Sequence, residues 1–115
     1  MSRRYIYVPK TIEDMKCDYF TGENIAWHRW MLSDDEFNVL WDCGVFEYLN
    51  EKFDVMIDAF EEEWIMYQYL YLEYDELIKE LDKFMNICGR EINKLIQLID
   101  MTIECRTYIG FSCRR

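Results

Sequence analysis

The chain contains little proline, glycine or histidine. One proline and four glycines among 115 residues leave little room for long flexible loops. The single histidine, His28, excludes a metal site built on a histidine pair, and its position between two tryptophans favours a structural or interface role. The Ser-x-x-Lys, Gly-x-Ser-x-Gly and glycine-rich phosphate-loop motifs are also missing. We therefore predict that the protein is no enzyme and binds no cofactor.

Paired cysteine motifs are missing too. The five cysteines, at positions 17, 43, 88, 105 and 113, include no Cys-x-x-Cys pair, so the usual zinc spacings are absent and no metal is predicted. An odd number of cysteines cannot all pair within one chain. We expect Cys88 and Cys105 to pack as small hydrophobic side chains beside apolar helical stripes, and Cys17 and Cys113 to be exposed.

Long apolar runs are also missing. The longest uncharged run, residues 64–72, is too short and too polar to span a membrane, and residues 1–5 lack an apolar signal core. We expect a cytoplasmic protein with reduced thiols and no membrane partner.

What the chain has in excess is negative charge and aromatic side chains. The net charge is −10, hydrophobic residues make up 51% of the chain and aromatics 17%. Residues 34–82 hold sixteen acidic side chains against two lysines, a net charge of −14, and the remainder carries +4. Such acidity disfavours a nucleic-acid backbone as partner and favours a basic protein. The alternative is that the acids only keep the domain soluble.

The hydrophobic pattern predicts one α+β domain over residues 1–115, mostly helical with a small antiparallel sheet. Residues 5–8 are aromatic and β-branched and precede Pro9, and residues 107–111 have the same composition near the other terminus. We expect the C-terminal strand to pair with the first strand or with residues 25–30. Ser33 and Glu36 have capping-box spacing, so a helix begins there, and Gly44 ends it before a second short helix.

Two later segments have the apolar spacing of amphipathic helices. One stripe runs through residues 77–85 and the other through residues 92–103, with Gly89 between them. A short connection of this kind predicts an antiparallel helix pair. Between the early and the late helices, residues 54–58 are predicted to form an extended or buried linker.

Residues 54–74 form the candidate binding region, because carboxylates are followed there by a dense run of aromatics. Tyrosines at 67, 69 and 71 alternate, which predicts an extended stretch with all three on one face. Aromatic anchors beside steering charge are typical of protein interfaces. The alternative is that the tyrosines line the core. The predicted partner-binding residues are Asp54, Asp58, Glu61, Glu62, Glu63, Trp64, Tyr67, Tyr69, Tyr71 and Tyr74.

Parts of the chain resemble small acidic bacterial immunity proteins of toxin systems. The resemblance covers residues 32–65 and rests on residues 32–40 with their capped acidic helix, on Gly44-Val45-Phe46 and Leu49-Asn50, and on the isoleucine, aspartate, aromatic and acidic run at residues 56–65. Residues 92–111 are similar to the closing helix and strand of such proteins. The resemblance implies a stoichiometric inhibitor that neutralises a cognate toxin, with an acidic face docked over a basic cleft such as that of a nuclease.

Two other functions fit the sequence. A phage-encoded inhibitor of a host defence nuclease would use the carboxylates to imitate nucleic-acid phosphates. A small metal-dependent hydrolase would gather a hard cation on the carboxylates of residues 54–63, although no Asp-x-Asp-x-Asp-Gly loop is present.

Overall fold

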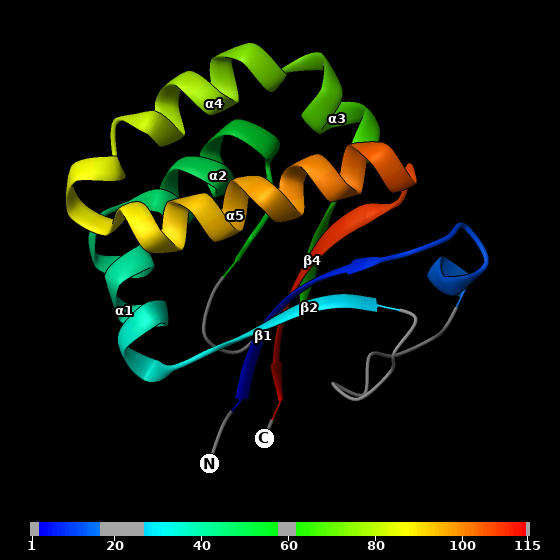
Figure 1. Cartoon of the computed structure of the whole chain (residues 1–115), viewed down its shortest axis with the longest axis horizontal. Helices are drawn as coiled ribbons and strands as arrows, with labels where there is room; N and C mark the ends of the chain where they lie inside the picture. Colours follow the sequence, from blue (N-terminus) through cyan, green and yellow to red (C-terminus); the bar gives the residue numbers. More distant parts are fainter. Residues whose placement is uncertain (1–2, 17–26, 58–61, 115) are drawn as a thin grey trace.

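A four-stranded antiparallel sheet and five α-helices make up the computed structural model, which describes residues 3–16, 27–57 and 62–114 (Figure 1). The strands are β1 (Arg3–Pro9), β2 (Trp27–Leu32), β3 (Glu63–Met66) and β4 (Tyr108–Arg114), in the order β2-β1-β4-β3. The helices are α1 (Asp34–Asp42), α2 (Val45–Phe53), α3 (Tyr67–Leu72), α4 (Tyr74–Asp82) and α5 (Met85–Cys105), with a short 3-10 helix at Asp14–Lys16. The predicted α+β class is confirmed.

The two terminal strands lie side by side at the centre of the sheet. In β1 and β4, Ile6 pairs with Phe111 and Tyr7 with Gly110, and the start of β1 lies beside the end of β4, where Arg3 pairs with Arg114 (Figure 1). Two partners were predicted for the C-terminal strand, and in the structure it pairs with the first strand. Strand β2 pairs with the other edge of β1. Strand β3, which the sequence did not predict, pairs with β4.

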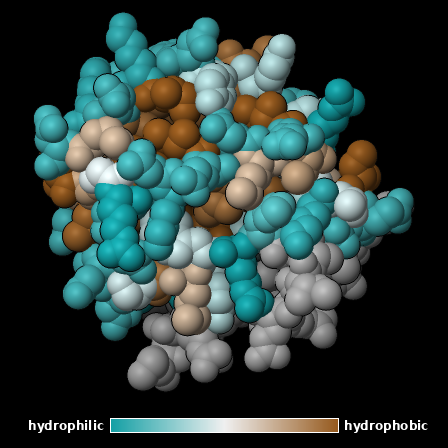
Figure 2. All heavy atoms as spheres, viewed as in Figure 1, coloured by the Kyte–Doolittle hydropathy of each residue, from teal (hydrophilic) through white to brown (hydrophobic). Residues whose placement is uncertain are grey.

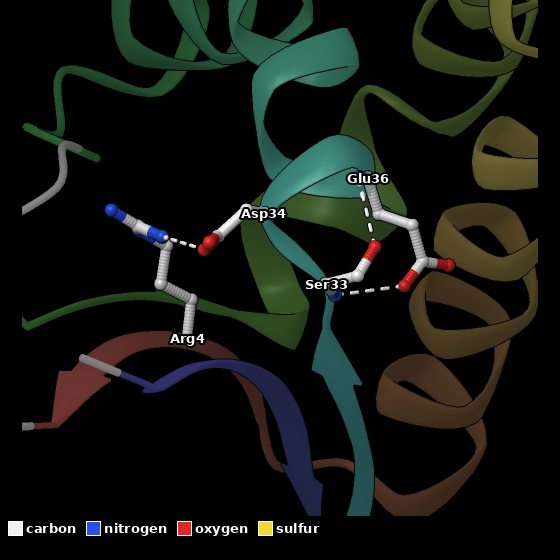
Figure 3. Close-up of polar contacts among 4 residues, drawn as sticks. All are labelled: Arg4, Ser33, Asp34 and Glu36. Carbon is white, nitrogen blue, oxygen red and sulfur yellow. Dashed lines mark hydrogen bonds and ion pairs between the residues drawn. The ribbon is translucent and has the colours of Figure 1, made fainter. Parts of the chain in front are cut away.

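Helix α1 begins at the predicted capping box. The Glu36 backbone N–H donates to Ser33 Oγ at 3.1 Å, and the Ser33 N–H donates to Glu36 Oε1 at 2.9 Å (Figure 3). Burial raises the pKa of Glu36, but the hydrogen bonds from Ser33 and the charge of Lys94 lower it overall. Arg4 of β1 contacts Asp34 at 3.0 Å, which ties the first helical turn to the sheet (Figure 3).

The late helices form the predicted antiparallel pair, with different boundaries. Helices α4 and α5 run in opposite directions across the molecule (Figure 1). The prediction of one stripe over residues 77–85 was wrong at its end, because α4 stops at Asp82 and Met85 already belongs to α5. The expected break at Gly89 is a kink at Cys88, whose φ of −144° and ψ of 49° are not helical.

The main core lies between the helices and one face of the sheet. Ile6 and Val8 of β1 meet helical side chains there, among them Leu40, Leu81 and Ile99. Side chains alternate along a strand, so Tyr5 and Tyr7 point to the opposite face, where they form a second cluster with Tyr108. In the linker before β3, residues 55–57 belong to neither a helix nor a strand. Ile57 is buried, as predicted, whereas Met56 is exposed.

In the part of the chain that the structure describes, no helix is both long enough and apolar enough to cross a membrane.

Candidate protein-binding surface

The tyrosine-rich segment is helical, so the predicted extended stretch with three tyrosines on one face was wrong. Residues Tyr67–Leu72 form α3, and the Tyr67 N–H donates to the Thr107 carbonyl at 3.0 Å, next to the start of β4. Two turns are too short for a helical period to show in the sequence, and tyrosine has a strand preference that hides it. Leu70 is the one fully buried side chain of this helix and fixes it to the core.

Helix α3 presents large side chains to solvent. Tyr69 is 59% exposed, Tyr71 68% and Leu72 77%, whereas Tyr67 is half-buried. The alternative that these tyrosines line the core is therefore wrong for Tyr69 and Tyr71. Figure 2 shows that hydrophilic side chains dominate the helical side of the molecule, with separate hydrophobic groups among them. Exposed aromatic and aliphatic side chains close together commonly mark an interaction site.

A large open hollow lies beside α3, at its junction with α4 and α5. Its volume is about 700 Å³. Tyr71, Leu72 and Tyr74 supply apolar surface, and Ile103 of α5 lies among the lining residues. Four carboxylates complete the lining, namely Glu73, Asp75, Glu76 and Asp100. The lining of the hollow therefore combines aromatic rings and carboxylates, which come from α3, α4 and α5.

A second hollow of about 290 Å³ lies on the other side of Leu72. It is lined by Lys52, Phe53, Asp54, Tyr69, Leu72 and Glu73. Leu72 and Glu73 line both hollows, so the end of α3 is a ridge between them. We call the whole region the α3 surface and define it by Tyr69, Tyr71, Leu72, Tyr74, Asp54, Glu73, Asp75, Glu76 and Asp100.

Negative charge prevails on the α3 surface. Its five carboxylates face one lysine, Lys52, whose Nζ lies 3.1 Å from both Glu73 and Glu76. Burial lowers the pKa of Lys52, but its hydrogen bonds to Glu76 and Glu73 raise it overall, so it stays protonated and connects α2 to α4. The Lys52 side chain is only 14% exposed, so the solvent-exposed charges of this surface are mainly carboxylates.

Tyr74 connects α4 to α5 within the large hollow. Its hydroxyl donates to Asp100 Oδ1 at 2.5 Å. This hydrogen bond, together with burial and the neighbouring charge of Asp100, raises the pKa of Tyr74 to about 12. The contact holds the aromatic ring and the carboxylate together on the wall of the hollow.

The acids predicted around β3 accept hydrogen bonds from within the chain. Tyr7 Oη donates to Glu62 Oε1 at 2.6 Å, and the Met56 N–H donates to Glu63 Oε2 at 3.2 Å. Trp64 is exposed but packs near Tyr108 on the sheet, with ring centroids 6.2 Å apart. Asp58 and Glu61 lie outside the described residues.

The structure thus places the predicted binding residues in two separate regions. It brings Asp54, Tyr69, Tyr71 and Tyr74 together around α3, and it places Glu62, Glu63 and Trp64 on or beside β3. The predicted residues did not include five members of the α3 surface, namely Leu72, Glu73, Asp75, Glu76 and Asp100. Asp100 lies 26 residues beyond Tyr74, and only the antiparallel packing of α4 and α5 brings the two together.

No group of three or more His, Cys, Asp or Glu side chains that could hold a metal ion occurs among the residues the structure describes. The carboxylates of the α3 surface are instead arranged around apolar hollows and a lysine. That arrangement suits recognition of a cationic macromolecule better than coordination of a hard cation.

Compared with models of protein families, with curated proteins and with solved structures, the chain matches none of them. What the protein binds has to be inferred from its own surface.

Proposed function

We propose that the protein is a stoichiometric protein inhibitor of the immunity-protein kind, which neutralises a cognate toxin in the cytoplasm. It binds a basic partner through the α3 surface and catalyses no reaction. The observation that carries this proposal is the exposure of Tyr69, Tyr71 and Leu72 beside two hollows edged by carboxylates.

The side chains of the α3 surface suit a tight interface. Tyrosine combines a large apolar ring with few rotatable bonds, so its burial costs little conformational entropy. Leu72 at the ridge and Tyr71 beside it supply apolar area for the centre of a contact, and the hollows accept projecting side chains of a partner. A stable interface buries roughly 800 Å² on each side, so the α3 surface would form its centre and the flanking helices its rim.

The carboxylates orient an approaching basic partner and speed its association. Negative charge around the anchors attracts a positively charged surface over several ångströms and raises the association rate. A toxin that cleaves nucleic acid needs a basic substrate groove, and an acidic inhibitor complements such a groove. Blocking that groove would stop the toxin without any chemical step.

The experiment is affinity purification from the lysate of the native host, with tagged wild-type protein and two matched pairs of variants. Leu72→Ser is paired with Ile87→Ser, since Ile87 is also a highly exposed helical aliphatic, at 68%, and lines neither hollow. Asp75→Lys is paired with Glu47→Lys, an exposed acid on α2. The captured protein is identified by mass spectrometry and assayed for toxicity with and without the inhibitor.

The proposal expects one basic protein in a stoichiometric complex, lost or weakened at least tenfold by Leu72→Ser and Asp75→Lys and retained by both controls. Its activity should fall to background at one equivalent of inhibitor. Capture of a defence nuclease would instead support the phage-inhibitor alternative. Equal loss in the α3 variants and their controls would rule out the α3 surface.

A further inference from the structure

Two cysteines that lie far apart in the sequence meet in the core. Cys43 caps the C-terminus of α1, and Cys88 lies at the kink of α5. Their Sγ atoms are 3.6 Å apart, although 45 residues separate them. This contact takes no part in the α3 surface, since neither cysteine lines its hollows.

Both cysteines lie where a regular helix is interrupted. The turn after Cys43 continues into Gly44, whose φ of +97° is left-handed, and Cys88 has non-helical φ and ψ angles. Each thiol also lies near a carbonyl of its own helix, Cys43 Sγ at 3.6 Å from Leu40 O and Cys88 Sγ at 3.5 Å from Phe84 O. A disulfide has an S–S length of about 2.0 Å, so the two sulfurs must approach by roughly 1.5 Å. Rotation of the two side chains, with small adjustments at these helix breaks, can supply that movement.

We propose that Cys43 and Cys88 are a modification site, at which a reversible intramolecular disulfide joins α1 to the kink of α5 under oxidising conditions. The oxidant is a small disulfide, oxidised glutathione. The Cys43 thiolate attacks one sulfur of oxidised glutathione, the glutathione S–S bond breaks, and one glutathione thiolate leaves and takes up a proton. Cys88 then loses its proton and attacks the Cys43 sulfur of the mixed disulfide, which releases the second glutathione. Two electrons pass from the cysteine pair to glutathione.

The order of the two attacks follows from exposure. Cys43 is half-buried, whereas Cys88 is only 3% exposed. Burial, together with the hydrogen bond and charge of Cys43, raises the pKa of Cys88 to about 12, so Cys88 is the less nucleophilic of the pair by exposure and by protonation and attacks second. Its closeness to Cys43 then makes the second attack intramolecular, which compensates for its low thiolate fraction.

The disulfide would close a loop that holds α2, β3, α3 and α4. Closing a loop of this length restricts the unfolded chain, so the oxidised protein should melt on the order of 10 °C above the reduced protein. Reduction by dithiothreitol should return the melting temperature to its former value.

The test is peptide mapping after incubation of the folded full-length protein with oxidised glutathione, alkylation of the remaining thiols and tryptic digestion without reductant. The five cysteines lie in five different tryptic peptides, so every pairing gives a distinct mass. We expect a cross-link between residues 30–52 and residues 84–90 as the dominant disulfide product. In urea, where the native contact is lost, the same treatment should give a mixture of pairings.

Three variants complete the design. Cys43→Ser and Cys88→Ala should both abolish the cross-link and the rise in melting temperature, and Cys105→Ser, another half-buried cysteine, should retain both. Cys43→Ser is the variant least apt to disturb folding, because its side chain is partly exposed. Dominance of another pairing or of glutathione adducts in the wild-type protein, or equal yields of the cross-link with and without urea, would overturn the proposal.

Discussion

Gly110 of β4 lies against the ring of Tyr7, and Gly110→Ala tests this contact directly. A Cβ atom at position 110 would lie 2.3 Å from Tyr7 Cζ and 2.6 Å from Cε2, well inside the range at which carbon atoms repel. The ring has little room to move aside. Tyr7 is 1% exposed, donates to Glu62 at 2.6 Å and packs edge-on against Tyr108 with centroids 6.1 Å apart.

The cost of Gly110→Ala can be estimated from these contacts. Overpacking of a rigid site costs about 1–3 kcal/mol. Displacing the Tyr7 hydroxyl from a carboxylate adds about 1.5–3 kcal/mol if that hydrogen bond is lost outright. Because the ring need only shift part of the way, we expect a loss of roughly 2–4 kcal/mol in the free energy of unfolding, measured by urea denaturation with tryptophan fluorescence at neutral pH.

A double-mutant cycle separates the steric clash from any other effect of the alanine. In a Tyr7→Val background the ring is absent, and Gly110→Ala should be neutral or stabilising by up to about 1 kcal/mol, because alanine restricts the unfolded strand more than glycine does. A cost of Gly110→Ala below about 0.5 kcal/mol in the wild-type background, or the same cost in both backgrounds, would show that the Tyr7 ring does not oppose a side chain at position 110.

Two further perturbations test the packing of α5. Ile99→Ala should reduce the free energy of unfolding by about 2–5 kcal/mol, because this side chain is fully buried among the helices, and a negligible shift of the urea midpoint would place the core elsewhere. The Tyr74 to Asp100 hydrogen bond should stabilise the wild-type protein below pH 10 and lose its effect as the pH rises toward 12, since the folded state retains the phenolic proton that the unfolded state releases. The difference in unfolding free energy between wild type and Tyr74→Phe should therefore shrink from pH 8 to about pH 12. A difference that stays constant over that range would show that the hydrogen bond does not raise the pKa of Tyr74.

Much of the fold could be predicted from local sequence signals. The capping box at Ser33 and Glu36 sets the start of α1, and the β-branched and aromatic residues near both termini form the central strands. These signals are short-range, and tertiary packing agrees with them. Strand β3 was missed because the residue types Glu63-Trp64-Ile65-Met66 do not alternate between polar and apolar. Its pairing also depends on β4, more than 40 residues later.

The candidate site was only partly predictable. Tyr69 and Tyr71 were identified as surface residues, although from a wrong extended conformation, because a two-turn helix leaves no period to read. The acidic run before Trp64 was predicted to lie with the tyrosines, but Glu62 and Glu63 lie on or beside β3, where they accept hydrogen bonds from Tyr7 and Met56. Asp100 joins the site through helix packing, which no local pattern shows.

We propose that the α3 surface recognises a basic protein by charge and aromatic anchors. The most direct measurement is the association rate constant between the purified partner and wild type, Asp75→Lys or Glu47→Lys, from about 50 mM to about 500 mM salt. We predict that Asp75→Lys associates roughly threefold or more slowly at low salt and with a weaker salt dependence, whereas Glu47→Lys, with the same net charge, behaves nearly as wild type. Identical rates for the two variants would contradict a partner site on the α3 surface.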